Sequence, residues 1–387
     1  MDFELTEEQR MIKELVRDFI TKEYPNELQK EDDVKTTYPL QLLPKMAELD
    51  LIRKIFPSAY GGLDGTIVDE CLILEELSRG SMAMGLDYFF QVCFGGKTIE
   101  FTGSEEQKKE YLPKICDGKL RSALALTEVE GGTDILGSLR TTAKQDGDDF
   151  VINGSKYWIT ASHVADILIT VARTSTDPKR KARGLSMFIV PAKSKGVTIN
   201  RIDKMVIRAM GSCEVIFEDV KVPKENLIGE IDKGWYSLVN TLNNERVTLA
   251  ACSVGGAQGV LDYALDYAKQ RYAFGKPIGQ FQAIQHYLAE MKADVECARL
   301  LMHEAAWAQS MKKLETPVLT TMAKWIAAEV HNRTALKGIR ILGGAGIETE
   351  NPMQRHYRDS TVLLFAPISN EMARNLVGES MGLPKSY

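Results

Sequence analysis

Apolar residues recur every three or four positions in the first third of the chain, which is the spacing of one helix face. Two capping boxes, at residues 6–9 and 104–107, are typical of helix starts. The first box is followed by apolar residues on one face: Met11, Ile12, Leu15, Val16, Phe19 and Ile20. Residues 57–62 contain proline and two glycines and interrupt the pattern. We therefore predict a helical domain over residues 1–118.

The pattern then changes to that of strands. β-branched and aromatic residues dominate four runs, at 150–159, 167–171, 187–191 and 215–220. Asn153-Gly154 predicts a hairpin turn within the first run, and Asp146-Gly147 is a further turn signal just before it. We predict a mainly antiparallel β domain over residues 119–227, with its last strand ending near Pro223.

Helical spacing returns after Gly234, and residues 228–387 are predicted to form a C-terminal helical bundle. Long helices are expected over 236–270, over 280–311, and from Thr316 and Pro317 as N-cap and first helical residue. The third helix should bury a stripe of Val318, Leu319, Met322, Ala323, Ile326 and Val330. Gly255 and Gly256 weaken the first of these helices, which indicates close packing or the approach of a ligand. The predicted fold class is α+β, in the order helical, β, helical.

Composition adds mainly exclusions. The 48 Lys+Arg and 53 Asp+Glu of the 387 residues give a formal charge of −5 without long like-charged runs, so no nucleic-acid partner is expected. No stretch of about 18 apolar residues occurs, so no membrane-spanning helix is expected, and the acidic start lacks the apolar core of a signal peptide. The 6 cysteines stand singly and the 5 histidines show no ligand spacing. We expect reduced, buried thiols, no metal site and a cytoplasmic location.

Neither a Walker A motif nor a GxGxxG motif between strand and helix is present. Five other motifs occur in one order: Thr127-Glu-Val-Glu-Gly-Gly-Thr-Asp134, Lys156-Tyr-Trp-Ile-Thr160, Arg271-Tyr-Ala-Phe-Gly275 through Gln282, Ile341-Leu-Gly-Gly344 and Tyr357-Arg-Asp359. Together with Tyr60-Gly-Gly62, they closely resemble the flavin-dependent acyl-CoA dehydrogenase family over essentially the whole chain. The resemblance implies an FAD cofactor, an acyl-CoA substrate, an electron-transfer flavoprotein as electron acceptor, and a homotetramer built on the C-terminal helices.

The resemblance also implies an FAD site between the β domain and the C-terminal helices. The residues that match positions beside the flavin ring are Leu126, Thr127, Gly132, Thr133, Trp158 and Thr160. Arg271, Phe274 and Gln282 match residues that reach the FAD of a neighbouring subunit. Arg340 and Gly344 match the segment near the adenine and pyrophosphate of FAD. Ser369 and Glu371 match residues near the other end of the FAD. Arg340 replaces the usual glutamine, and an arginine suits a pyrophosphate. Alone, Trp158 would more often be a core aromatic residue and Arg271 a solvated helix charge.

The catalytic base departs from the family pattern. In the family a glutamate removes the proton α to a thioester carbonyl while the flavin accepts the β-hydride, and the backbone N–H of this residue donates to the carbonyl. Pro367 occupies the matching position, so both the carboxylate and the N–H are missing. Glu245 matches the position from which some branched-chain and long-chain members supply the base, with Asn243 and Arg246 beside it as candidate substrate-binding residues. The alternative for Glu245 is a surface carboxylate paired within its own helical turn.

Asp87 is the second candidate for a catalytic carboxylate. Its neighbours Met84, Leu86, Tyr88, Phe89 and Phe90 match the helix that lines the acyl pocket, and the aromatic residues, Tyr88 among them, favour a compact acyl group. Burying an unpaired carboxylate there costs at least a few kcal/mol, which makes Asp87 a candidate functional residue. Some members that act on alicyclic thioesters are similar in using a pocket aspartate. The alternative is a helix charge that faces water or pairs with Lys97.

Two hypotheses follow. The first is an acyl-CoA dehydrogenase for a short branched or alicyclic thioester, with Glu245 as base and Asp87 shaping the pocket. In a variant of it, Asp87 is the base of a 1,4-type, vinylogous dehydrogenation of a cyclic enoyl-CoA. The second is a flavoprotein of the same fold that acts on other small molecules, as an oxidase or monooxygenase, or serves as a binding scaffold. Pro367 keeps this second hypothesis open.

Overall fold

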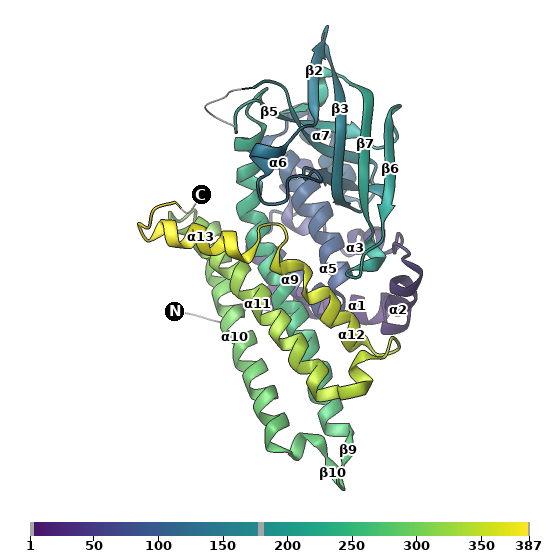
Figure 1. Ribbon diagram of the computed structural model, residues 1–387, viewed down its shortest axis with the longest axis vertical. Coiled ribbons are helices and arrows are strands. Elements are labelled where there is room, and N and C mark those ends of the chain that lie inside the picture. The colour runs from purple at the N-terminus through teal and green to yellow at the C-terminus, as the bar shows by residue number, and fades with distance from the viewer. Residues whose placement is uncertain (1–3, 177–181, 386–387) are drawn as a thin grey trace.

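A computed structural model describes residues 4–176 and 182–385, apart from the side chains of Asn240 and Asn243. The chain forms helices, then a sheet, then helices again, with the sheet at one end of the molecule (Figure 1). The predicted α+β class with this order is therefore confirmed. None of the helices in the described ranges has both the length and the apolar character needed to span a bilayer.

The N-terminal part of the chain folds into helices, and the sequence signals indicated where the first and the last of them begin. They are α1 (Glu7–Glu23), α2 (Asn26–Lys35), α3 (Leu42–Glu48), α4 (Ile67–Gly80), α5 (Met82–Phe89), α6 (Thr98–Thr102) and α7 (Glu105–Cys116). Both predicted capping boxes are present, at the starts of α1 and α7. The α1 helix buries Ile12, Val16, Phe19 and Ile20, whereas Met11 and Leu15 are exposed. After α5 the chain continues as a π-helical segment, η3 (Phe90–Lys97), a form that often marks functional sites.

The middle of the chain forms one sheet. Its elements are β1 (Ser122–Ala125), α8 (Ile135–Ser138), β2 (Thr142–Asp146), β3 (Asp149–Thr160), β4 (Ile167–Arg173), β5 (Leu185–Pro191), β6 (Val197–Ile202), β7 (Ser212–Val222) and β8 (Leu227–Ile228). The strand order is β6-β7-β3-β2-β4-β5-β8, and β1 pairs with β4. Most pairs are antiparallel, but β1–β4 and the short β2–β4 contact are parallel. Phe150, Phe188 and Val215 belong to the core of this domain.

The predicted hairpin turn at Asn153-Gly154 is wrong. β3 runs straight through these residues, and the turn lies earlier, where Asp146 pairs with Asp149. At Gly154 the pairing with β7 shifts, φ is +144°, and a Cβ atom would lie 2.6 Å from the backbone of Thr141. The glycine is therefore required by a bulge and a close backbone approach rather than by a turn.

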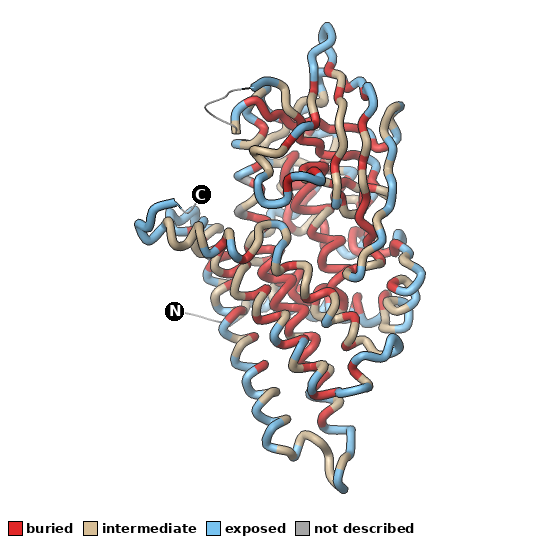
Figure 2. Tube along the Cα trace, viewed as in Figure 1, coloured by how far each residue is buried: buried red, intermediate tan, exposed pale blue. Residues whose placement is uncertain are grey.

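The C-terminal helices form the long axis of the molecule (Figure 1). They are α9 (Gly234–Gln270), α10 (Gln282–Ser310), α11 (Thr316–Leu342), α12 (Pro352–Ser360) and α13 (Asn370–Ser380), with the hairpin β9 (Tyr272–Ala273) and β10 (Lys276–Pro277) after α9 and a 3₁₀ segment η8 (Gly343–Ile347) after α11. The buried faces of α4, α9 and α11 share one core with the N-terminal helices, whereas the hairpin end is exposed (Figure 2).

Close packing accounts for the glycines in α9. A Cβ atom at Gly255 would lie 2.0 Å from the carbonyl oxygen of Glu75, and one at Gly259 would lie 2.2 Å from that of Arg79. At Gly256 a Cβ atom would lie 2.5 Å from the His331 ring. The glycines therefore let α9 approach the backbone of α4 and the side chain of His331 in α11. Of the two explanations that the sequence offered, close packing or the approach of a ligand, these contacts support close packing.

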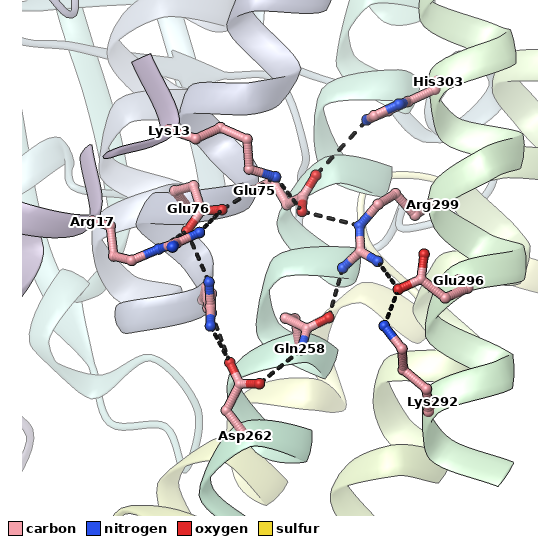
Figure 3. Close-up of polar contacts among 11 residues, drawn as sticks. Lys13, Arg17, Glu75, Glu76, Gln258, Asp262, Lys292, Glu296, Arg299 and His303 are labelled. Atoms are coloured by element: carbon pink, nitrogen blue, oxygen red, sulfur yellow. Dashed lines mark hydrogen bonds and ion pairs between the residues drawn. The ribbon is translucent and has the colours of Figure 1, made fainter. Parts of the chain in front are cut away.

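Two buried carboxylates of α4 join helices from both ends of the chain (Figure 3). Glu75 accepts from Lys13 at 3.0 Å and from Arg299 at 3.1 Å, and Glu76 accepts from Arg17 at 2.9 Å. We call the residues drawn in Figure 3 the Glu75–Glu76 ion network: Lys13, Arg17, Glu75, Glu76, Arg79, Gln258, Asp262, Lys292, Glu296, Arg299 and His303. This network connects α1, α4, α9 and α10.

All 6 cysteines are free thiols. Five of them are buried, but Cys297 in α10 is exposed, so the prediction of buried thiols is wrong at that position. In the described part of the chain no group of His, Cys, Asp and Glu side chains is arranged to hold a metal ion.

Candidate active site

Glu245 lies in the first third of α9 and is 1% exposed. Burial raises the pKa of Glu245 to about 8, and the positive charges of Arg246 and Lys324 oppose part of this rise. Its Oε1 atom has no hydrogen-bond partner among the described residues. The alternative of a solvent-facing carboxylate paired within its own turn is therefore wrong. Glu245 is a buried carboxylate with an acceptor atom to spare, as a general base requires.

Lys324 of α11 connects this carboxylate to the segment that contains Pro367. Its buried Nζ donates to the carbonyl oxygen of Ile368 at 2.6 Å and to Oδ1 of Asn370 at 3.1 Å. Burial lowers the pKa of Lys324 to about 8, and Glu245 is the largest influence in the opposite direction. Lys324 therefore acts on Glu245 through its charge and holds the backbone of the residue after Pro367 by a hydrogen bond.

The sequence did not predict Lys324 as a site residue. The expected stripe on α11 consisted of apolar residues. Of these, Ala323 and Val330 are buried, whereas Val318, Leu319, Met322 and Ile326 are only partly buried. The most buried face carries Thr320, Lys324, Ala327 and His331 instead. These residues follow one another at helical spacing, and a lysine on such a face was the signal that could have indicated a buried charge.

Asp87 is also fully buried, at 0% exposure in α5. The hydroxyl of Tyr38 donates to its Oδ1, and Oδ2 has no hydrogen-bond partner among the described residues. Burial raises the pKa of Asp87 to about 6, against the hydrogen bond from Tyr38 and the charge of Arg121. The alternative pairing with Lys97 is wrong, because Lys97 donates to Ile55 and to Glu100.

Aromatic side chains follow Asp87 closely. The rings of Phe89, Phe90 and Phe94 lie 4.9–5.6 Å apart, measured between centroids. Tyr88, predicted to bind substrate, is fully buried and donates its hydroxyl to the carbonyl oxygen of Leu51 at 2.9 Å. Its hydroxyl is therefore engaged within the protein, which leaves the ring for any contact with an acyl group.

For the other two candidate substrate-binding residues, the structure gives a side-chain contact only for Arg246. Arg246 is half-buried, and its Nη1 donates to Oγ1 of Thr321 at 3.3 Å. The side chain of Asn243 lies outside the described residues.

Glu70 of α4 is another buried carboxylate close to the site, and the sequence did not predict it as a site residue. Both of its oxygens lie 3.4 Å from Nδ2 of Asn244, the residue before Glu245. Burial raises the pKa of Glu70 to about 7, and the charge of Lys97 opposes part of the rise. The signal that could have found it was the pair Asp69 and Glu70 at the start of a helix that continues with the apolar run Cys71 to Leu74.

The residues that match the flavin-ring positions lie together in the middle domain. Tyr157 N–H donates to the carbonyl oxygen of Thr127 at 2.8 Å, and the buried Lys156 joins Glu128 at 2.9 Å and Leu126 at 3.0 Å. These contacts connect the segment with Leu126, Thr127, Gly132 and Thr133 to the segment with Trp158 and Thr160.

This surface fits a flat aromatic group such as the flavin of FAD. Trp158 is 55% exposed and has φ +64°, at a point where the pairing of β3 with β7 is shifted. It is therefore not a core aromatic residue. Gly132 is exposed, and no atom lies within 4 Å of a Cβ built on it. An exposed indole and an open backbone at Gly132, on two segments that are hydrogen-bonded to each other, leave room for a planar ligand to pack.

A second group of predicted cofactor residues lies at the opposite end of the molecule (Figure 1). Arg271, Phe274 and Gln282 lie in and after the β9–β10 hairpin, and Arg340 and Gly344 lie at the end of α11 and in η8. The 37 residues of α9 separate its two ends by about 55 Å. Phe274 is 96% exposed. The two groups of one chain therefore lie too far apart to contact a single FAD.

Ser369 and Glu371 lie at the start of α13. The Ser369 hydroxyl accepts from the N–H of Met372 at 3.2 Å as the helix N-cap, and Glu371 accepts from Arg374 at 3.3 Å. Pro367, just before them, is exposed and follows a cis peptide bond.

Comparisons with known proteins agree with this arrangement. Models of the acyl-CoA dehydrogenase N-terminal, middle and C-terminal domains match residues 6–119, 123–220 and 232–382. Cyclohex-1-ene-1-carbonyl-CoA dehydrogenase of Geobacter metallireducens is 36% identical over 98% of this chain and 99% of its own length. The caffeyl-CoA reductase-Etf complex subunit CarC of Acetobacterium woodii is 37% identical over 92% of this chain and 93% of its own.

Among solved structures, butyryl-CoA dehydrogenase from Megasphaera elsdenii superposes with a TM-score of 0.94 and 34% identity, covering 99% of this chain and 100% of that one. The chain therefore belongs to the acyl-CoA dehydrogenase family. It is an enzyme of the FAD-dependent oxidoreductase class, and FAD is its cofactor.

Proposed function

We propose that this enzyme dehydrogenates a short branched or alicyclic acyl-CoA thioester to the enoyl-CoA, with Glu245 as the base that takes the α-proton. One observation carries the assignment of the base: Glu245 is completely buried beside Lys324, and Lys324 holds the segment in which Pro367 replaces the usual glutamate. Among the carboxylates that act on Lys324, Glu245 has the largest influence, ahead of Glu371 and Glu329.

In the proposed reaction each of these residues has a separate role. Glu245 accepts the α-proton, and its raised pKa suits a base that works near neutral pH. Lys324 and Arg246 favour the ionised form of Glu245 by their positive charge. FAD supplies the two-electron acceptor for the β-hydride. The buried rings of Tyr88, Phe89 and Phe94 exclude water and favour a compact acyl group.

A second candidate function is the 1,4-type dehydrogenation of a cyclic enoyl-CoA with Asp87 as base. Its support is the complete burial of Asp87 with Oδ2 free to accept a proton. A relative named cyclohex-1-ene-1-carbonyl-CoA dehydrogenase makes this class of substrate worth testing. In this version Glu245 would line the pocket without taking the proton.

The assembly and partners are also proposals. The separation of the two groups of cofactor residues supports a homotetramer in which Arg271 and Phe274 reach the FAD of a neighbouring copy. An electron-transfer flavoprotein is proposed as electron acceptor, because the relative CarC belongs to an Etf complex. The free thiols support a cytoplasmic location. We propose three domains, over residues 1–118, 119–227 and 228–387.

Anaerobic titration of the FAD-loaded enzyme with CoA thioesters tests the proposed function. Branched, cyclohexanecarbonyl, cyclohexenecarbonyl and straight-chain thioesters are added separately, and the visible absorbance of the flavin is recorded. We expect bleaching by branched or cyclic thioesters at lower concentration than by the straight chain. An absence of bleaching with every thioester would contradict the proposal and favour a flavoprotein that acts on other molecules.

A further inference from the structure

Asp87 is held through only one of its two carboxylate oxygens. Tyr38 donates its hydroxyl to Oδ1, while Oδ2 has no hydrogen-bond partner among the described residues. Gln91, one helical turn later, accepts from the backbone N–H of Ser122 at 3.0 Å, and its Nε2 has no hydrogen-bond partner among the described residues. A buried carboxylate with one anchored oxygen has a fixed orientation and keeps the second oxygen for a ligand.

The segment that carries Tyr38 is itself held in place. Tyr38 lies between α2 and α3, and the carbonyl oxygens two residues on either side of it accept guanidinium donors. Arg201 donates to Thr36 at 2.7 Å, and Arg121 donates to Leu40 at 2.6 Å. Both arginines belong to the middle domain. Tyr38 therefore keeps a fixed position relative to the sheet as well as to α5.

The Tyr38 ring packs close to the end of β3, which carries the predicted flavin-ring residues Trp158 and Thr160. The ring is buried in a small cluster with Ala83, Ala161 and Met210, and Ala161 directly follows Thr160 of β3. The imidazole of His163 lies edge-on to it at 5.8 Å between centroids. A series of contacts therefore runs from Asp87 through Tyr38 to Ala161, directly after the end of β3.

We infer that Tyr38 is the positioning residue of Asp87: its hydroxyl, fixed by the Arg121 and Arg201 contacts to its segment, orients the carboxylate so that Oδ2 serves the bound acyl group. The inference rests on the proposed function only for the identity of that ligand. Burial together with the charge of Asp87 raises the pKa of Tyr38 well above its usual value, so the hydroxyl stays a donor. Among the described residues, the groups that oppose the raised pKa of Asp87 are Tyr38, Arg121 and Gln91.

The first test measures the ionisation of Asp87 directly in the FAD-loaded enzyme without substrate. Infrared difference spectra against pH follow the protonated carboxyl, and Asp87→Asn identifies its band. Tyr38→Phe removes one hydrogen bond to the charged form, so the pKa of Asp87 should rise by about one pH unit. Tyr24→Phe is the matched control, because Tyr24 is a buried tyrosine that donates to Asp32 at 3.0 Å elsewhere. An unchanged titration in Tyr38→Phe would overturn the inference.

A second variant keeps the test decisive if Tyr38→Phe does not fold. Arg201→Gln releases the contact to Thr36 and leaves the tyrosine in place, so the pKa of Asp87 should shift in the same direction by a smaller amount. No shift in this variant would likewise contradict the role of the held segment.

A kinetic measurement separates this inference from the proposed function. With a cyclic thioester that reduces the flavin, Tyr38→Phe should move the pH dependence of any step that needs ionised Asp87 upward, as in the infrared titration. If Asp87→Asn binds the thioester and reduces the flavin as the wild type does, Oδ2 does not serve the acyl group, and the inference is overturned even if the infrared shift persists. If no thioester reduces the wild type, the proposed function is contradicted by that result alone.

Discussion

Two opposing effects determine the pKa of Glu245. Burial raises its pKa to about 8, while Arg246 and Lys324 pull it down. A base must be deprotonated to accept the α-proton, so the rate of flavin reduction should rise as the pH increases through about 8 in the free enzyme. Stopped-flow flavin reduction across pH measures this. A rate that falls over the same range would contradict Glu245 as base.

Lys324 offers a direct way to shift that profile. Lys324→Met removes a positive charge that favours ionised Glu245, so the pKa of Glu245 should rise and the profile should move upward by about one pH unit. Lys324→Arg keeps the charge and serves as the control. A profile that does not move in Lys324→Met would show that Lys324 acts only on the segment around Ile368.

Some residues of the site could be proposed from the sequence and others could not, depending on how far away in the sequence their partners lie. Glu245 and Asp87 could be predicted, because each stands in a local motif. Tyr38 and Lys324 could not, because their contacts reach Asp87, 49 residues away, and Ile368, 44 residues away. Such contacts can be identified only in the folded structure. Lys324 alone has a local signal, because it lies on a helix face of small residues.

At the level of elements, the contact between α4 and α9 depends on glycine. Gly255→Ala would place a Cβ atom 2.0 Å from the carbonyl oxygen of Glu75, so the helices must move apart. We expect a loss of about 1–3 kcal/mol in the free energy of unfolding, measured by urea denaturation. Gly378→Ala in α13 is the control: its nearest atom would be Leu383 Cδ1 at 3.7 Å, so we expect no loss. Equal effects of the two substitutions would contradict the packing account.

The elements themselves were largely predictable. Capping boxes located α1 and α7, and proline at the start located α11. Asn153-Gly154 misled because the same residues that favour a turn also serve a bulge, and only the approach of Thr141 distinguishes the two. The predicted stripe on α11 is right only in part, since Ala323 and Val330 are buried but its other members are half-buried, as expected of a helix that packs on several sides.

At the scale of the whole molecule, the Glu75–Glu76 ion network connects the first helix to the C-terminal bundle. Burial alone would raise the pKa of Glu75, but His303, Lys13 and Arg299 together hold it well below its usual range. Its stabilising contribution is therefore complete above the unfolded-state pKa of 4.5 and is lost as the pH falls toward the folded-state value.

Glu75→Gln should consequently destabilise the protein by about 3 kcal/mol at neutral pH, since it leaves nearby cations without their partner. It should also weaken the loss of stability on acidification, which denaturation midpoints measured from neutral to acidic pH would reveal. Glu296→Gln is the control, because Glu296 is 41% exposed and pairs at the edge of the network, so its effect should stay below about 1 kcal/mol. The same acid sensitivity in wild type and Glu75→Gln would contradict this role.

The order of helical, β and helical parts was predictable from periodicity, whereas the division into domains at 118 and 227 stays a prediction. The separation of the two cofactor groups could not be read from residue spacing, because it depends on α9 being one uninterrupted helix of 37 residues.

The most direct test of the central claim compares two carboxamide variants in single-turnover flavin reduction. With the thioester that bleaches the wild type best, Glu245→Gln should slow reduction by about 10²–10⁴-fold, the usual contribution of a general base, while Asp87→Asn should slow it by less than about tenfold. Retained FAD in both variants confirms that the site is intact. Near-normal reduction by Glu245→Gln together with loss of reduction in Asp87→Asn would contradict the account and make Asp87 the base.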